Sequence, residues 1–252
     1  GNGNVSVKSS APIAVTGATA QNGIEAFSAE LGNISVTAAA NVTASDGNGI
    51  QATHAGPGKT HINVLAGTTQ GGTSGVTAVS TSGTIHINNS ATIQNMSGLP
   101  GDLGVATSGG GNAILVNNTG GVVTGTVSLT GTGTNHFVNT GLWNTLGANT
   151  FAGSSHLINN GTIDVFGTTT ISGLTNLTNS GTLNLAPGET AGTLDLGGPG
   201  PAKGKLTLTG GTVEGGTLSS SSFDVQAGTI SANLVGSGAL TKSGAGTVIL
   251  SG

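Results

Sequence analysis

Residues 136–195 divide into three consecutive blocks that decide the fold. The blocks read HFVNTGLWNTLGANTFAGSS from 136, HLINNGTIDVFGTTTISGLT from 156 and NLTNSGTLNLAPGETAGTLD from 176. Five columns match across all three: Asn139, Asn159 and Asn179; Gly141, Gly161 and Gly181; Phe137, Leu157 and Leu177; Trp143, Ile163 and Leu183; and Thr150, Thr170 and Thr190. This agreement indicates three copies of one structural repeat of twenty residues.

A longer and looser repeat precedes these blocks. Gly-Ile-Glu-Ala at 23–26 is followed by Gly-Ile-Gln-Ala at 49–52 and Gly-Val-Thr-Ala at 75–78, spaced by 26 residues. Each copy is followed by a polar loop of variable length and a short alternating strand such as Ile62-Asn63-Val64. The chain therefore keeps its strands and varies its loops, as expected when loops project from a regular scaffold.

Short strands and tight turns repeating every 20 to 26 residues, without helical periodicity, predict a β-solenoid. Coils stacked about 4.8 Å apart complete each other's hydrogen bonds and core. The 252 residues then form roughly eleven coils. The aligned Asn-x-Gly pairs predict turns with left-handed backbone geometry, and the asparagines can hydrogen-bond from coil to coil.

Other architectures fit less well. A propeller needs longer repeats, and a calcium-binding β-roll needs Gly-Gly-x-Gly-x-Asp nonapeptides, which are absent from the sequence. Disorder disagrees with a chain that is 35 % hydrophobic and rich in alternating β-branched residues. A β-sandwich remains the main alternative, although it does not naturally contain three gapless copies of twenty residues.

The composition excludes several classes of function. The chain has five Lys, no Arg, nine acidic residues and a net charge of −4, so it lacks the basic surface that binds nucleic acid. The absence of Cys excludes disulfides and thiolate chemistry. No apolar run reaches the length of about 18 residues that a membrane-spanning helix needs.

The C-terminal residues carry a family resemblance. Residues 236–252 resemble the autotransporter-associated β-strand repeat, which runs Gly-x-Gly-x-Leu-x-Lys-x-Gly-x-Gly-Thr-Leu-x-Leu-Ser-Gly. The matching positions are Gly236, Gly238, Leu240, Lys242, Gly244, Gly246, Thr247, Leu250, Ser251 and Gly252. Val248 replaces a leucine of the motif and is also a good strand former.

The resemblance implies a passenger domain of a type V secretion system. Such a passenger is usually a right-handed parallel β-helix, exported through a C-terminal outer-membrane β-barrel and either displayed on the bacterial surface or released. This chain contains no such barrel sequence, and we interpret it as an internal fragment of a longer polypeptide. Within it we expect irregular coils of about 26 residues over 1–135, regular twenty-residue coils over 136–195, and a final β-helix section over 196–252.

Candidate chemical groups are few. His136 and His156 share a column, but the third copy has Asn176, and two ligands are fewer than a zinc site usually has. His61 and His86 are expected to point outward, and His54 to lie in a loop. No two acids share a repeat column, because Asp164 aligns with Asn144 and Asn184, and Asp195 with Ser155 and Thr175. The acids are Glu25, Glu30, Asp46, Asp102, Asp164, Glu189, Asp195, Glu214 and Asp224.

Other conspicuous residues are assigned to structure. Trp143 aligns with core positions and is expected to pack in the interior. The glycine-rich stretches 109–111 and 197–201 lack the Lys-Ser/Thr of a phosphate-binding loop, and Pro199 with Pro201 is expected to mark a break between coils. We therefore predict no catalytic, cofactor-binding or metal-binding residues and no cofactor.

These observations favour a non-enzymatic passenger segment that serves as an adhesin, a host-interaction surface or a stalk. The expected partners are a host-cell receptor, a glycan or a second rod, together with the protein's own outer-membrane barrel. Contacts are expected at the loops 56–59, 67–75 and 96–111. The alternative is part of a polysaccharide-acting β-helix enzyme, which would gather three or more carboxylates or lysines in one groove.

Overall fold

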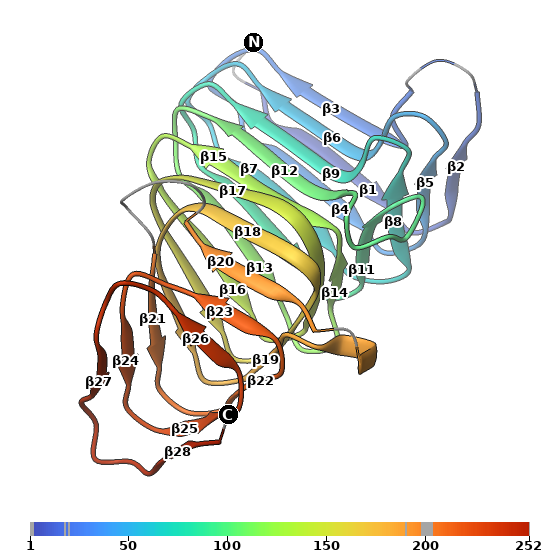
Figure 1. Cartoon of the computed structure of the whole chain (residues 1–252). Helices are drawn as coiled ribbons and strands as arrows, with labels where there is room; N and C mark the ends of the chain where they lie inside the picture. The colour runs from blue at the N-terminus through green and yellow to red at the C-terminus, as the bar shows by residue number, and fades with distance from the viewer. Residues whose placement is uncertain (1–2, 18, 20, 190, 198–203, 252) are drawn as a thin grey trace.

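Each turn of the chain lays one strand on each of three faces, and successive turns stack on one another. The computed structural model describes residues 3–17, 19, 21–189, 191–197 and 204–251. The described strands pair in parallel from coil to coil within one continuous sheet. Figure 1 shows these coils wound into a rod, with the two chain ends at opposite ends of it. The predicted parallel β-helix is confirmed.

The strands sort into three faces by their pairing. Face A contains β3 (Ile24–Ser28), β6 (Asn48–His54), β9 (Ser74–Ser80), β12 (Leu103–Gly109), β15 (Thr126–Gly131), β20 (Thr193–Leu196), β23 (Thr217–Ser219) and β26 (Asn233–Val235). Face B contains β1 (Val5–Ser9), β4 (Ile34–Ala38), β7 (Thr60–Val64), β10 (Ile85–Asn89), β13 (Ala113–Asn117), β16 (Thr134–Asn139), β21 (Lys205–Leu208), β24 (Phe223–Val225) and β27 (Leu240–Lys242). Face C contains β2 (Ile13–Val15), β5 (Val42–Ala44), β8 (Thr68–Gly71), β11 (Thr92–Asn95), β14 (Val122–Thr124), β19 (Thr182–Asn184), β22 (Thr212–Glu214), β25 (Gly228–Ile230) and β28 (Val248–Leu250).

Two long strands cross all three faces. β17 (Leu142–Asn159) and β18 (Thr162–Asn179) each begin on face C, pass along face A and end on face B. With these two, the nine separate strands of face B make eleven rungs in the part of the chain that the structure describes. The expectation of about eleven coils is therefore correct. A 3₁₀ turn, η1 (Pro187–Glu189), interrupts the coil after β19.

The core fills the interior of the coils as columns of apolar side chains. Phe137, Leu157 and Leu177 lie in register, and all three are fully buried. Trp143 is also fully buried, as predicted, above Ile163. Its Nε1 donates a hydrogen bond to the Gly125 carbonyl at 3.0 Å, so the one polar atom of the indole is satisfied in the core.

A ladder of five asparagines runs through this interior at the end of face B. Asn139, Asn159 and Asn179 stack as predicted, and the column extends upstream to Asn117 and Asn89. The Nδ2 of each of the first four donates to the Oδ1 of the next asparagine at 2.7–2.8 Å, and Asn179 Nδ2 donates to the Thr212 carbonyl at 3.1 Å. All five side chains are fully buried. We call this column the asparagine ladder.

The ladder also satisfies the turns beside it. Asn139 Nδ2 donates to the Thr162 carbonyl at 2.9 Å, and Asn159 Nδ2 makes the same bond to Thr182. Each side chain thus joins the next coil through both an amide and a backbone carbonyl. Because an amide carries both donors and an acceptor, a stack of asparagines satisfies itself where a single buried asparagine would not.

The glycines after the ladder have a different role from the predicted one. Gly141, Gly161 and Gly181 are absent from the left-handed region that we expected at these positions. They are required by close packing instead, because a Cβ on Gly161 would lie 2.2 Å from the Gly141 carbonyl oxygen and one on Gly181 2.1 Å from that of Gly161. These turns stack so closely that only glycine fits.

One predicted column slips in the structure. Thr150 pairs with Ser172, and Thr170 pairs with Ala148, because bulges near residues 145–147 and 150–155 shift the register on face A. Thr190, the third member, lies outside the described residues. The two blocks align in sequence without gaps, but the paired residues do not follow that alignment on face A. One bulge shifts the register and a second restores it before the asparagine ladder.

Asn139→Ala tests the ladder. The substitution leaves the buried Asn159 Oδ1 without its donor and opens a small cavity, so we expect a loss of about 2 kcal/mol in the free energy of unfolding. Urea unfolding measures the change. Asn160→Ala is the control, since its exposed side chain accepts a bond only from Ser180 and the effect should stay within about 0.5 kcal/mol. Equal midpoints for the two variants would contradict the role of the ladder.

Gly161→Ala tests the stacking of the turns. The added methyl group meets a backbone carbonyl that belongs to the neighbouring coil, so we expect a lower thermal midpoint and a loss of more than about 1 kcal/mol. Gly210→Ala is the matched control, because no atom lies within 4 Å of a Cβ there. If both variants melt with the wild type, close packing does not explain these glycines.

Candidate functional site

Face C presents two outward columns of polar side chains. The first, which we call the threonine column, runs through Thr68, Thr92, Val122, Leu142, Thr162, Thr182, Thr212, Thr229 and Ile249. The second, the amide column, runs through Thr43, Gln70, Gln94, Thr124, Asn144, Asp164, Asn184 and Glu214. The two columns stand side by side and present mainly hydroxyl, amide and carboxylate groups, with Val122, Leu142 and Ile249 as apolar members of the threonine column.

Hydrogen bonds between coils order the amide column. Gln94 Nε2 donates to Gln70 Oε1 at 2.9 Å, and Gln70 Nε2 donates to Thr43 Oγ1 at 3.4 Å. Further along, Asn184 Nδ2 donates to Asp164 Oδ1 at 3.1 Å. These bonds restrict the outward side chains to defined positions along the rod.

Asp164 lies between Asn144 and Asn184, as the alignment predicted. The next residue in the column is Glu214, so two acids do share a column, which corrects the expectation that none would. They are two rungs apart. Partial burial raises the pKa of Asp164, and the hydrogen bond from Asn184 opposes this effect.

The remaining acids are dispersed over the rod. Asp195 pairs with Thr170 and Ser219, not with the predicted Ser155 and Thr175, because the segment containing η1 lengthens this coil. Glu25 points outward from β3 and accepts a hydrogen bond from Asn22. The described residues contain no group of three or more His, Cys, Asp or Glu side chains that would hold a metal ion.

Four histidines face outward in one column of face B, as predicted. The His61 and His86 ring centroids are 5.4 Å apart with the planes tilted by 53°. The His136 and His156 centroids are 5.5 Å apart with the planes at 18°. The predicted neighbouring of His136 and His156 is therefore confirmed, and a second pair accompanies it. Burial lowers the pKa of His86 and of His136. The neighbouring imidazole lowers it further, His61 in the case of His86 and His156 in the case of His136.

His54 lies in the core, not in a loop. It is the last residue of β6, is fully buried, and its Nε2 lies 2.6 Å from the Gly32 carbonyl oxygen, to which it donates. The following Ala-Gly-Pro suggested an early end of the strand. Ile50 and Ala52 both point inward, two residues apart. Continuing this alternation by two residues predicts that His54 also points into the core.

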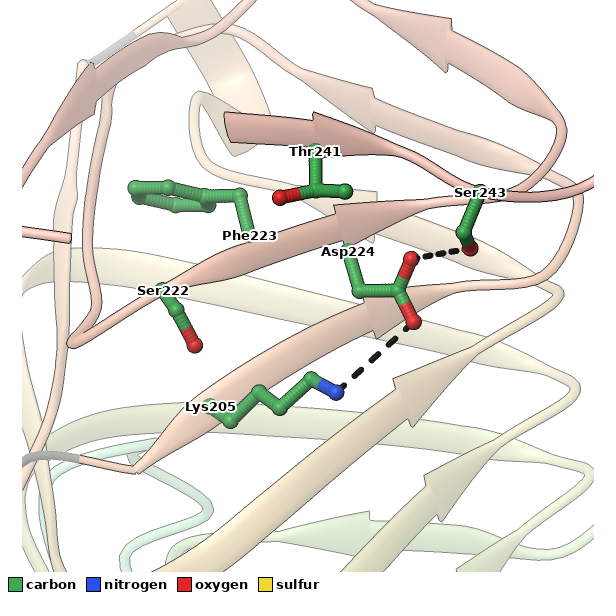
Figure 2. Close-up of a pocket in the computed structure, with 6 residues that line it drawn as sticks. All are labelled: Lys205, Ser222, Phe223, Asp224, Thr241 and Ser243. Atoms are coloured by element: carbon green, nitrogen blue, oxygen red, sulfur yellow. Dashed lines mark hydrogen bonds and ion pairs between the residues drawn. The ribbon is translucent and has the colours of Figure 1, made fainter. Parts of the chain in front are cut away.

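An ion pair between Lys205 and Asp224 lines a small pocket, which we call the hollow, at the C-terminal end of face B (Figure 2). Lys205 Nζ lies 3.7 Å from Asp224 Oδ2, and the Ser243 hydroxyl donates to Asp224 Oδ1. The bond from Ser243, with smaller contributions from Gln226 and Lys205, lowers the pKa of Asp224. The hollow has a volume of about 240 Å³ and is lined by this one carboxylate, Lys205, Phe223 and three hydroxyl side chains. Glycoside hydrolysis usually needs two carboxylates, so the hollow lacks that machinery.

The predicted contact loops are only partly loops. Residues 56–59 form a turn between β6 and β7, as expected. Residues 67–75 consist mainly of β8 and the start of β9, and residues 96–111 include β12, so both predictions were too long. The projecting part is 96–102, where Leu99 is 60 % exposed and the Pro100 carbonyl accepts a hydrogen bond from the Leu146 amide.

Two glycine-rich segments were predicted to have a structural role and not to bind phosphate. Gly109 ends β12, and residues 110–112 form the turn to β13. Pro199 and Pro201, which were expected to mark a break, lie outside the described residues. No helix in the described part of the chain is long and apolar enough to cross a membrane.

The last coil leaves apolar side chains uncovered. Leu240 and Leu250 are each about half exposed, at inward positions that the next coil covers elsewhere in the rod. Ile249 is also about half exposed, but it lies in the outward threonine column. Lys242 lies in register with the core residue Val225, so its stem occupies an inward position on β27. The residues that resemble the autotransporter-associated repeat thus supply the final rungs of faces B and C.

Asp164→Asn tests the electrostatics of the amide column. A raised pKa in the folded state means that ionised Asp164 destabilises the fold at neutral pH, and that this cost disappears as the pH falls through the folded pKa. We expect Asp164→Asn to raise the urea midpoint at pH 7 and to match the wild type at pH 3. Asp46→Asn, on an exposed turn, is the control without a midpoint change. A lower midpoint for Asp164→Asn at pH 7 would contradict this account.

Comparisons with known protein families, with characterised proteins and with solved structures found no match.

Proposed function

We propose that the chain is a non-enzymatic segment of an autotransporter passenger, displayed on the bacterial surface or secreted. In this role it acts as an adhesin, a host-interaction surface or a stalk. The observation that carries the proposal is the parallel rod, whose described outward faces bear ordered polar columns and dispersed charges. The resemblance of residues 236–252 to the autotransporter-associated repeat supports the same assignment.

Face C is the best candidate for the binding face. From Thr162 to Thr229 the threonine column repeats a hydroxyl group about every 4.8 Å along the rod, beside the amide column. Such groups both donate and accept hydrogen bonds, as the hydroxyls of a glycan require. Polar groups repeated along a rod suit many weak contacts along an extended glycan.

The charge distribution favours binding over catalysis. The polysaccharide-acting alternative requires several carboxylates or lysines in one groove, whereas the hollow in Figure 2 has Asp224 and Lys205 only. Asp224 is already engaged by Ser243 and Lys205, which lower its pKa and oppose a role as proton donor.

A binding screen tests the proposal. The purified chain is applied to a glycan array, to host cell-surface proteins and to itself. The test variant Thr162→Arg/Thr212→Arg places two bulky cations in the threonine column, two rungs apart. The matched variant Thr53→Arg/Ser108→Arg does the same on face A. We expect the face C variant to weaken glycan binding at least about tenfold, or 1.4 kcal/mol, and the face A variant to bind like the wild type.

Two results would overturn the assignment. If the face A variant loses as much glycan binding as the face C variant, face C is not the specific binding face. Release of reducing ends or unsaturated sugars from a polysaccharide panel, abolished by Asp224→Asn, would establish an enzyme instead.

A further inference from the structure

The outward column of face B brings four imidazoles into two pairs. In order along the rod the column reads Ser35, His61, His86, Ile114, His136, His156, Asn176 and Lys205. The members of each pair are on adjacent rungs, so the parallel hydrogen bonds of the sheet fix their spacing. Ile114 separates the pairs.

The four rings have no bonding role within the described chain. None of them hydrogen-bonds to a described protein group, whereas the buried His54 does. All four are partly exposed on the outer side of face B. Their ring nitrogens therefore remain available to a ligand from solvent, and rotation about the Cβ–Cγ bond reorients them at little cost.

The spacing within each pair suits a shared metal ion. An ion held at about 2.1 Å by one nitrogen of each ring, with a tetrahedral angle between the two bonds, separates the ring centroids by about 5 Å. The observed separations are 5.4 and 5.5 Å. The planes of His61 and His86 are tilted by 53° and those of His136 and His156 by 18°, so the rings of each pair turn about their side-chain bonds to direct one nitrogen each at the ion.

We propose that each histidine pair on face B binds one late first-row divalent metal ion, with water completing its coordination. Imidazole favours copper, nickel and zinc over magnesium and calcium, and affinity for such sites rises to a maximum at Cu²⁺. The ligand class is therefore a hydrated transition-metal ion, with Cu²⁺ bound more tightly than Zn²⁺.

The protonation state of the rings agrees with this assignment. Metal ligation needs neutral imidazole, which is the main form of an ordinary histidine side chain at pH 7.4. The sequence predicted no metal site because two imidazoles are fewer than the ligands of a structural zinc site. An open site of two imidazoles and water has weaker, exchangeable binding, which needs no third protein ligand.

Calorimetric titration of the tag-free, chelator-treated chain at pH 7.4 tests the proposal. We expect two equivalents of Cu²⁺, weaker uptake of Zn²⁺ and none of Mg²⁺. His86→Ala should remove one equivalent, His156→Ala the other, and the double variant both. Electron paramagnetic resonance of the bound Cu²⁺ should show nitrogen ligands that disappear in the double variant.

Asn88→Ala is the matched control, because it alters the neighbouring outward column of the same face and should retain both equivalents. Urea midpoints confirm that each variant is folded. Full Cu²⁺ uptake by the double variant, or none by the wild type, overturns the proposal. If the wild type binds one equivalent of Cu²⁺, and this equivalent is lost in His86→Ala but retained in His156→Ala, the His136 and His156 pair is not a metal site.

Discussion

Parallel hydrogen bonding between consecutive coils is the constraint on which the rest of this structure depends. It places each residue directly over its counterpart in the next coil. Every column must therefore contain side chains that can stack on similar side chains at the coil spacing. Leucine over phenylalanine meets this condition in the interior. The asparagine ladder meets it with polar groups, because each amide donates to the amide below and accepts from the one above.

The same constraint shapes the outer surface. Amides stack favourably on face C, where Gln94 and Gln70 hydrogen-bond. The charge of Asp164 is less favourable in the same column, because the carboxylate is partly buried and its pKa rises. On face B the constraint holds imidazoles 5.4 and 5.5 Å apart without any contribution from a folded pocket. A solenoid can therefore build a repeated binding surface from single substitutions in successive coils.

Sequence patterns predicted the architecture well where coils have equal length. The twenty-residue blocks identified the core columns of Phe137 and Trp143 and the stacking of Asn139, Asn159 and Asn179. They missed Asn117 and Asn89, whose spacings to the next ladder member are 22 and 28 residues, because loop insertions hide the register. They also misplaced His54, because the Gly and Pro after it suggested that the strand had already ended.

The sequence by itself determined that the chain is a stack of strand-built coils, since alternation and repeat length are local properties of the residues. It also placed the outward histidines correctly. Only the tertiary structure decided which residues meet across coils: the slip of Thr150 to Ser172, the neighbouring of Asp164 and Glu214 in one column, and the close approach that demands Gly161. These depend on how bulges and insertions add up along each coil, and a backbone path of that kind is settled by packing against the preceding coil.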